Sequence, residues 1–249
     1  MPSTSGRIMN AHEFYDYNKG CVQIIPEFPG DITNDESVAN WVINNSGMGW
    51  LELDIKFDLE QWKQESNHAR FVDHRGSIHP GWNSCCIHGI EVDKTSNWDQ
   101  YGYSNEDEVD YKWTELSELT PSIKKFWEQF PYETYKRIRF MELEPGGVIS
   151  PHNDLPPNST VDLTHYGVPI NVAIIHPDEC YMTLEGQGVV PWQEGKMFMI
   201  NIRNTHSVIN NSNQARIHLI AHGSPGSKKK EFLKLVADSY RKAYEHSKI

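Results

Sequence analysis

The sequence predicts a mainly β domain, a closed sandwich or jelly roll, with an N-terminal α/β extension and a C-terminal helix. Three observations support this fold class. Strand-like segments recur about every 8 to 12 residues between residues 135 and 222. Turn-forming residues stand in the breaks, and no helical pattern interrupts the series. After residue 226 the apolar residues switch to helical spacing. Short strands in series favour a closed β architecture over a parallel α/β sheet.

The N-terminal third combines short helices with extended and irregular chain. A capping-box pattern at residues 33–36, followed by apolar residues at helical spacing, predicts a helix near 34–45. Residues 50–58 are expected to be extended, and the polar, acidic stretch 91–110 is expected to form a long surface loop. Pro121 suits the first turn of a helix, so a second helix is expected to begin there.

Eight strands are predicted in the β region. The breaks between them contain Pro-Gly, Pro-Asp and Glu-Gly pairs, which suit tight turns. The predicted strands span residues 135–143, 148–151, 168–176, 181–185, 189–192, 196–201, 205–210 and 215–222.

The C-terminal segment has the pattern of an amphipathic helix. Phe232, Val236, Tyr240 and Ala243 share one face, and basic residues occupy the other. Acidic residues are interleaved with the basic ones, which favours a helix packed on the β domain over one bound to a membrane.

The expected organisation is a single domain over residues 1–249. Residues 1–131 would form the N-terminal extension with the substrate-side elements, 132–224 the jelly-roll core, and 225–249 the C-terminal helix. The sequence leaves the oligomeric state open.

Composition excludes several classes of protein. The chain has 23 Lys and Arg against 34 Asp and Glu, so its formal net charge is 23 − 34 = −11. This charge disfavours binding to nucleic acid or to anionic membranes. No apolar run approaches the ~18 residues of a membrane span, and the N-terminus lacks the apolar core of a secretory signal. Four cysteines without a CxxC motif favour reduced thiols. We therefore expect a cytoplasmic protein.

Three side chains of the β region have the pattern of a metal site. His152 and Asp154 are two residues apart, so on extended chain they point to the same side. His206 belongs to a separate predicted strand. Two imidazoles and one carboxylate leave half of an octahedral coordination sphere open, as non-haem Fe(II) oxygenases require. Taken alone, the His-x-Asp tripeptide is as readily a turn with a capping aspartate. The second histidine and a following arginine favour the metal site.

That arginine is Arg216, ten residues after His206. The polar cluster Asn210-Asn211-Ser212 lies between them and suits a hairpin turn. A turn centred on Asn211 would place His206 and Arg216 opposite one another on one face. Arg216 would then stand behind the metal, where its guanidinium suits the far carboxylate of a dicarboxylate co-substrate.

Three stretches of the β region carry a family resemblance: RIRFMELEPGGVISPHND, VPINVAIIHPDEC and WQEGKMFMINIRNTHSVINNSNQARIHLIAHG. Together they resemble the aspartyl/asparaginyl β-hydroxylase-like branch of the Fe(II)/2-oxoglutarate-dependent dioxygenases, over about a third of the chain. The resemblance implies a double-stranded β-helix, the cupin-type jelly roll. It also implies an enzyme that binds one Fe(II), takes 2-oxoglutarate as co-substrate and uses O2.

The resemblance implies roles for individual residues. His152, Asp154 and His206 match the iron ligands, and Arg216 matches the arginine that binds the C5 carboxylate of 2-oxoglutarate. Arg139 matches an arginine of the free-amino-acid hydroxylases that holds a substrate or co-substrate carboxylate. Asn171 falls where peptide-acting members place a polar co-substrate contact, although the residue type differs.

Asp154 marks a departure from part of the family. The peptide-directed aspartyl/asparaginyl hydroxylases lack a carboxylate ligand at this position, whereas the proline-hydroxylase-like members have one. The complete triad therefore disfavours a peptide Asp or Asn substrate. It also disfavours halogenation, which in the wider superfamily accompanies a vacant carboxylate site.

The expected activity is hydroxylation of an unactivated C–H bond in an amino acid, peptide or related small acid, with succinate and CO2 as co-products. Trp82, with its neighbours Arg75 and Asn83, is a candidate for the substrate pocket; the alternative is that this segment is a buried strand leading into the β domain. Two other functions stay open: a metal-binding cupin that binds or isomerises a small molecule without oxygen chemistry, and a catalytically silent interaction module.

Overall fold

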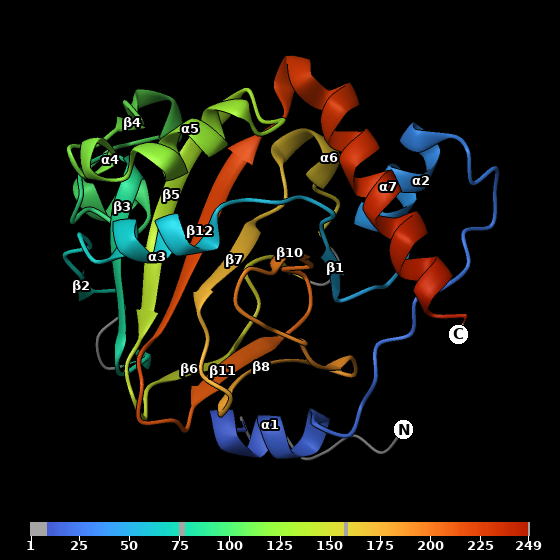
Figure 1. The fold of residues 1–249 in the computed structure, drawn as a ribbon, viewed down its shortest axis with the longest axis horizontal. Helices are drawn as coiled ribbons and strands as arrows, with labels where there is room; N and C mark the ends of the chain where they lie inside the picture. The colour runs from blue at the N-terminus through green and yellow to red at the C-terminus, as the bar shows by residue number, and fades with distance from the viewer. Residues whose placement is uncertain (1–8, 75–77, 157–158, 249) are drawn as a thin grey trace.

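Two antiparallel sheets of unequal size form the centre of the protein; most helices lie along the outside of the larger sheet, and α1 lies against the smaller one (Figure 1). This computed structural model describes residues 9–74, 78–156 and 159–248. The strands are β1 Trp50–Glu52, β2 Val72–Asp73, β3 Trp82–Gly89, β4 Lys112–Trp113, β5 Thr134–Leu143, β6 Val148–His152, β7 Ile170–Ile175, β8 Cys180–Leu184, β9 Gly188–Val189, β10 Met197–Ile200, β11 His206–Asn210 and β12 Arg216–Ser224.

The helices are mostly short and lie mainly in the N-terminal half. They are α1 Ala11–Asn18, α2 Asp35–Asn44, α3 Leu59–Ser66, α4 Leu116–Leu119, α5 Pro121–Gln129, α6 Leu163–Tyr166 and α7 Lys229–His246. The described part of the chain also contains the short 3₁₀ segments η2 Trp98–Tyr101, η3 Glu106–Glu108 and η4 Gly226–Lys228.

The larger sheet has the strand order β1-β10-β7-β12-β5-β3-β2, with β4 paired to β3, and the smaller one has the order β6-β11-β8-β9. The pairing brings together strands that are far apart in sequence. Strand β12 lies between β5 and β7, and β5 in turn pairs with β3 from the N-terminal third. The N-terminal region therefore contributes strands to the same sheet as the β region.

Period-two alternation gives the larger sheet two different faces. On β5, Ile138 and Phe140 point toward the helices, where they pack with residues of α2, α5 and α7. Arg139 and Met141 of the same strand point toward the smaller sheet. Strand β12 alternates in the same way, so its even-numbered residues from Arg216 to His222 face the space between the sheets.

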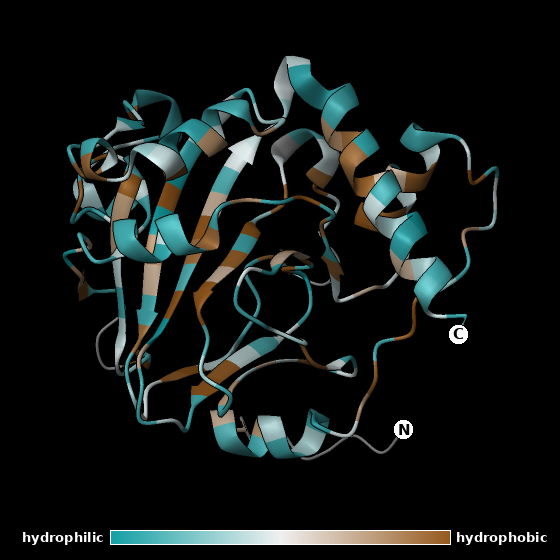
Figure 2. Cartoon of the chain, in the orientation of Figure 1, coloured by the Kyte–Doolittle hydropathy of each residue, from teal (hydrophilic) through white to brown (hydrophobic). Residues whose placement is uncertain are grey.

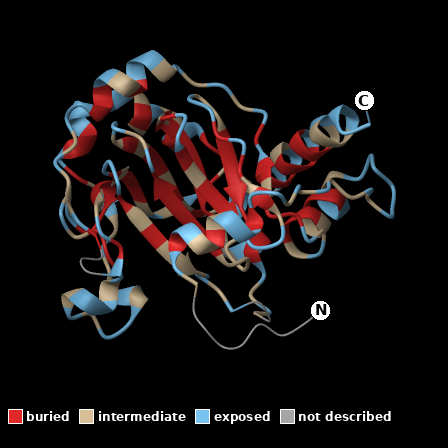
Figure 3. Ribbon diagram, turned by 90° about the horizontal axis from the view of Figure 1, so that it is seen from below, coloured by how far each residue is buried: buried red, intermediate tan, exposed pale blue. Residues whose placement is uncertain are grey.

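Burial follows this arrangement. Figure 3 shows buried residues concentrated on the strands, and Figure 2 shows apolar residues there and hydrophilic residues along much of α7. A second, smaller apolar cluster, which includes Leu143, Met182 and Phe198, lies between the two sheets and closes one end of that space. The polar residues of the other end are described below.

The predicted strands between residues 135 and 222 are present, but the expectation that no helix interrupts them is wrong. Helix α6 stands between β6 and β7, so the strand series does contain a helix. Asp162 caps it, because its carboxylate accepts a hydrogen bond from the Thr164 backbone N–H at 3.0 Å. A four-residue helix is too short to show a period in the sequence.

The predicted hairpin between His206 and Arg216 is also wrong. Strand β11 pairs with β6 and β8 in the smaller sheet, whereas β12 pairs with β5 and β7 in the larger sheet. Residues 211–215 therefore cross from one sheet to the other. The Asn210 side-chain amide fixes this crossing by donating to the backbone carbonyls of Leu143, Glu144 and Gln214 at 2.8 to 3.1 Å.

Smaller differences concern the N-terminal third. Helix α2 begins after Asn34, whose side chain accepts from the Ser37 N–H, so Asn34 and not Thr33 is the capping residue. Only Trp50–Glu52 of the expected extended stretch forms a strand. The stretch 91–110 contains the 3₁₀ segments η2 and η3 instead of loop alone.

Helix α7 packs against α2 and β1, as expected for a helix docked on the domain. Phe232, Val236 and Tyr240 are buried, and the Tyr240 ring lies edge-on to Trp41 at 5.6 Å. None of the helices in the described part of the chain has the length and apolar character that a membrane crossing requires.

Buried histidines predict how stability depends on pH. His88 of β3 lies between the rings of Trp113 and Tyr135, and burial lowers its pKa to about 4. In the unfolded chain its pKa is about 6.5, so between these values the unfolded state binds the proton more readily. We expect the free energy of unfolding to fall as pH decreases from 6.5 toward 4, by at most about 1.4 kcal/mol per pH unit for this residue.

Urea unfolding at pH 7 and pH 5 measures this loss. The variant His88→Gln should be less sensitive to the change in pH than the natural chain, because it removes one proton uptake on unfolding. An identical pH dependence in the two proteins would show that His88 is not kept neutral by burial.

Candidate metal and co-substrate site

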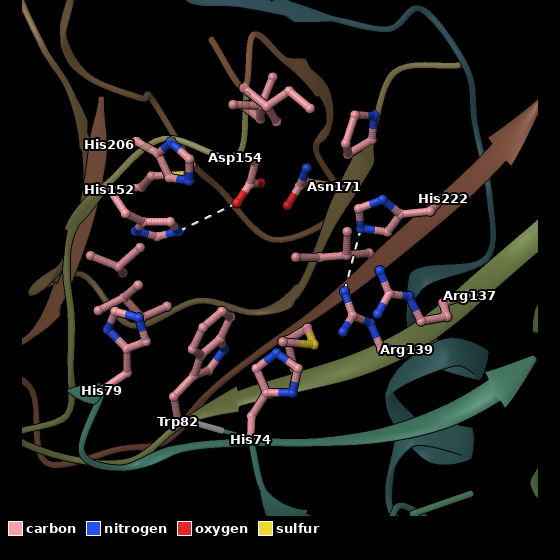
Figure 4. A pocket seen from close by; sticks show the side chains of 18 of the residues that line it. His74, His79, Trp82, Arg137, Arg139, His152, Asp154, Asn171, His206 and His222 are labelled. Carbon is pink, nitrogen blue, oxygen red and sulfur yellow. Dashed lines mark hydrogen bonds and ion pairs between the residues drawn. The ribbon is translucent and has the colours of Figure 1, made fainter. Parts of the chain in front are cut away.

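A cavity of about 570 Å³ lies between the two sheets. Strands β3, β5, β7 and β12 supply one wall and β6, β8 and β11 the other. Figure 4 shows the polar side chains that point into it, with the histidines of the smaller sheet on one side and arginines of the larger sheet on the other. The lining among described residues contains three arginines and a single carboxylate: Arg137, Arg139, Arg216 and Asp154. The cavity is therefore suited to anionic ligands.

The structure brings together the three predicted metal ligands. His152 ends β6 and His206 begins β11, and the two residues are opposite partners across these strands. Asp154 follows β6, where its backbone N–H donates to the Ile202 carbonyl. One ligand atom of each side chain lies within 4.8 Å of the other two, and His152 Nε2 is 3.7 Å from Asp154 Oδ1. Octahedral ligands stand ~3 Å apart around a metal, so a small contraction would let the three bind one ion.

Hydrogen bonds hold both imidazoles in the form that a metal requires. His152 Nδ1 donates to the Ser150 carbonyl at 2.8 Å, and His206 Nδ1 donates to the Asn204 carbonyl at 3.0 Å. The proton is thus on Nδ1 in each ring, and the Nε2 lone pair is available for a metal. Burial lowers the pKa of His206, and the neighbouring His152 lowers it further. A neutral His206 is the form that binds metal.

Arg216 reaches the same cavity from the larger sheet, across from the smaller one that carries the two histidines. It is 3% exposed, and no carboxylate pairs with it among the described residues. Its Nη2 donates to His218 Nδ1 at 2.8 Å, whereas its buried Nε has no hydrogen-bond partner. A buried guanidinium that lines a cavity and has no carboxylate partner among the described residues fits an anionic group such as the distal carboxylate of 2-oxoglutarate.

A second polar cluster lies where β5 and β12 pair further along. Arg139 Nη1 donates to the Thr95 carbonyl at 2.6 Å, and its Nη2 lies 3.4 Å from His222 Nε2. Arg137 Nη1 donates to the Ser96 carbonyl at 2.7 Å. Both guanidinium groups thus donate to backbone carbonyls of one loop, and both line the cavity (Figure 4).

The remaining predicted site residues differ in position. Asn171 of β7 and Trp82 of β3 line the cavity. Trp82 packs edge-on against His74 and His79. Asn83 is not a pocket residue, because its side chain donates to Glu142 and Glu144 on the other side of the strand. Arg75 lies outside the described residues.

Sequence reasoning missed His79 and Arg137 as cavity residues, whereas the two-residue spacing on β12 predicts that His222 shares a face with Arg216, and His222 does line the cavity. His79 accepts a hydrogen bond from the Ser150 N–H at 3.0 Å, and its ring lies 5.4 Å from that of His152. It therefore borders the three candidate ligands directly. The dense polar and aromatic composition of residues 74–89 was the available signal, but it did not select this histidine.

Comparison with known proteins gives one family match and several similar structures. The sequence profile of the family described as aspartyl/asparaginyl beta-hydroxylase matches residues 54–223. A search of curated proteins found no sequence match. An oxidoreductase of the 2OG-Fe(II) oxygenase family from Burkholderia pseudomallei shares 12% identity, with 83% of this chain and 96% of that chain covered and a TM-score of 0.50. This likeness confirms the predicted jelly-roll fold.

Two further solved structures are similar at lower TM-scores. A prolyl hydroxylase from Trichoplax adhaerens, in complex with a hypoxia inducible factor peptide fragment, has 11% identity, 83% and 97% coverage and a TM-score of 0.47. HygX from Streptomyces hygroscopicus, with nickel and 2-oxoglutarate bound, has 12% identity, 71% and 83% coverage and a TM-score of 0.46.

Proposed function

The chain belongs to the aspartyl/asparaginyl β-hydroxylase family and is a 2-oxoglutarate-dependent non-haem iron dioxygenase; from this premise we propose that it hydroxylates an unactivated C–H bond of an amino acid, peptide or related small acid. The balanced reaction is R–H + O2 + 2-oxoglutarate → R–OH + succinate + CO2. The observation that carries the proposal is the convergence of His152, Asp154 and His206 on one point of a cavity that Arg216 also lines.

Each residue has a distinct part in this proposal. His152, Asp154 and His206 would hold Fe(II) through two Nε2 atoms and one carboxylate oxygen, leaving three coordination positions open. Arg216 would bind the distal carboxylate of 2-oxoglutarate, and Asn171 would contact the same co-substrate. Bound Fe(II) would activate O2, which is the oxidant, and the oxidative decarboxylation of 2-oxoglutarate would supply two of the four electrons that O2 accepts. The protein orients both carboxylic acids and, through the apolar lining of Ile149, Met182 and Val208, limits the access of water.

The charge of the cavity supports an acidic substrate. 2-Oxoglutarate would occupy Arg216, which leaves Arg137 and Arg139 on the opposite part of the wall. These two guanidinium groups, with Trp82 as an aromatic surface nearby, suit a substrate that carries a carboxylate.

Stimulated release of succinate tests the proposal. The purified protein is supplied with Fe(II), ascorbate, 2-oxoglutarate and O2, and single amino acids, their N-blocked forms and a peptide library are screened for faster succinate formation. We expect at least one carboxylate-bearing compound to accelerate succinate release and to gain 16 Da as one hydroxyl group. A cupin that binds or isomerises a small molecule would form no succinate under any of these conditions.

Arg139→Gln is expected to weaken substrate binding selectively. The substitution removes the charge but keeps a side chain that can bond Thr95, so the KM for the acidic substrate should rise about tenfold or more. Succinate formation without substrate should change little, because that slow reaction uses only 2-oxoglutarate. Lys136→Gln is the matched control: it removes one positive charge from an exposed position of β5 three residues earlier, where Lys136 pairs with Glu106. Equal effects of the two substitutions would contradict a specific role for Arg139.

A further inference from the structure

Arg216 is anchored by two histidines that the proposed reaction does not otherwise use. His218 follows it on the same face of β12, and His176 lies just beyond the end of β7. Arg216 Nη2 is 2.8 Å from His218 Nδ1, and His218 Nε2 is 2.9 Å from His176 Nδ1. The three side chains thus form one continuous hydrogen-bonded chain that leads away from the cavity.

We propose that His218 and His176 are positioning residues, which hold the Arg216 guanidinium through neutral acceptor nitrogens in the orientation that binds the distal carboxylate of 2-oxoglutarate. This inference rests on the proposed function, and it assigns to the site two residues that neither contact the metal nor the reacting carbon.

The hydrogen bond from Arg216 to His218 determines the direction of both hydrogen bonds in this chain of side chains. Arginine has only donors, so His218 Nδ1 must accept and the proton of His218 must be on Nε2. That Nε2–H then donates to His176 Nδ1, which must also be unprotonated. Both rings are therefore neutral, and each has a single permitted tautomer. Protonation of either ring would place two donors face to face and break the chain.

The surroundings keep both rings in this state. His218 is 0% exposed, and burial and the Arg216 charge lower its pKa well below the usual value. The pKa of His176 is lowered to about 4, mainly by burial and in addition by the Arg216 charge, while a hydrogen bond with the Cys180 backbone and the charge of Glu194 act in the opposite direction. The His218 ring also packs edge-on against Trp192 at 4.5 Å, which limits its rotation.

A neutral imidazole beside Arg216 affects its charge differently from a carboxylate at the same place. A buried aspartate or glutamate beside Arg216 would neutralise its charge and compete with the co-substrate for its N–H groups. An imidazole nitrogen fixes one edge of the guanidinium without cancelling its charge. The positive charge of Arg216 is then left for the incoming carboxylate.

The test compares two 2-oxo acids that differ only in the distal carboxylate. 2-Oxoglutarate has this group, and 2-oxopentanoate has a methyl group in its place, while both can chelate Fe(II) through the 2-oxo acid. Anaerobic titration of the Fe(II)-loaded full-length protein gives a dissociation constant for each. We expect His218→Leu to weaken 2-oxoglutarate binding about tenfold or more, because one hydrogen bond to a charged group is lost, and to leave 2-oxopentanoate binding within about twofold.

Two further variants distinguish the loss of the hydrogen bond to Arg216 from a folding defect in His218→Leu. His218→Asn should recover most of the affinity, since its amide oxygen stands near the former Nδ1 and accepts from Arg216. His176→Phe, at a less buried position, should give an intermediate loss because His218 is then free to take the wrong tautomer. His88→Leu is the control for loss of a buried histidine elsewhere; it should leave the ratio of the two dissociation constants unchanged.

The outcomes separate this inference from the proposed function. Equal weakening of both 2-oxo acids by His218→Leu, or no weakening of either, would overturn the positioning role. Failure of the natural protein to bind Fe(II) and 2-oxoglutarate at all would refute the proposed function itself. A natural protein that prefers 2-oxoglutarate, with that preference lost in His218→Leu and recovered in His218→Asn, supports the inference.

Discussion

His206→Ala is expected to eliminate enzymatic turnover. The substitution would remove one of the two imidazoles proposed as metal ligands, so Fe(II) affinity should fall more than about 100-fold and succinate formation should drop below detection. The overall fold should persist, because His206 begins a strand whose pairing with β6 and β8 uses backbone groups. Metal content after dialysis, succinate formation and circular dichroism together measure the effect.

His165→Ala is a suitable control for this substitution. His165 is exposed on α6 and does not line the cavity, so its loss should change neither metal binding nor succinate formation. If His206→Ala retained the iron content and the turnover of the natural protein, His206 would not be a ligand.

Arg216→Ala is expected to have the second-largest effect, and on a different quantity. It removes the charge and the N–H groups assigned to the distal carboxylate, so the KM for 2-oxoglutarate should rise about 100-fold or more. Affinity for Fe(II) should stay near that of the natural protein, since Arg216 lies on the sheet opposite His152 and His206. Equilibrium metal binding and initial rates over a range of 2-oxoglutarate concentrations separate the two quantities.

A variant with weakened metal binding and an unchanged KM for 2-oxoglutarate would place Arg216 in the support of the metal site instead. Arg216→Lys adds a graded comparison. This substitution keeps the positive charge but loses the planar guanidinium. Its KM for 2-oxoglutarate should therefore lie between that of Arg216→Ala and that of the natural protein.

The strands could be predicted from the sequence, but their partners could not. Strands β5, β7 and β12 show apolar alternation and are bounded by turn residues, both of which are local signals. The hairpin predicted at Asn211 does not form, because β11 pairs with β6 and β8 whereas β12 pairs with β5 and β7. Strand pairing depends on segments that are distant in the sequence, and turn residues alone do not indicate which distant strands will pair.

The residues of the candidate site also divide into those that the sequence could predict and those that only the structure reveals. His152 and Asp154 are close because they are two residues apart, and His206 and Arg216 were found through their spacing and the family resemblance. His79 and Arg137 have no such spacing to the three candidate ligands. They reach the cavity because β3 pairs with β5 over most of its length. His218 shares the face of Arg216 because it is two residues further along the same strand, whereas His176 is 42 residues from His218 and only the three-dimensional structure brings it there.

Anaerobic titration with Fe(II) and 2-oxoglutarate tests the central claim most directly. The account predicts that the protein binds one equivalent of Fe(II) and that 2-oxoglutarate then produces a weak visible charge-transfer band, which neither component gives alone. Admission of O2 should bleach the band and yield succinate. A protein that gives no band with saturating Fe(II) and 2-oxoglutarate, and no succinate on exposure to O2, would contradict the assignment of His152, Asp154, His206 and Arg216.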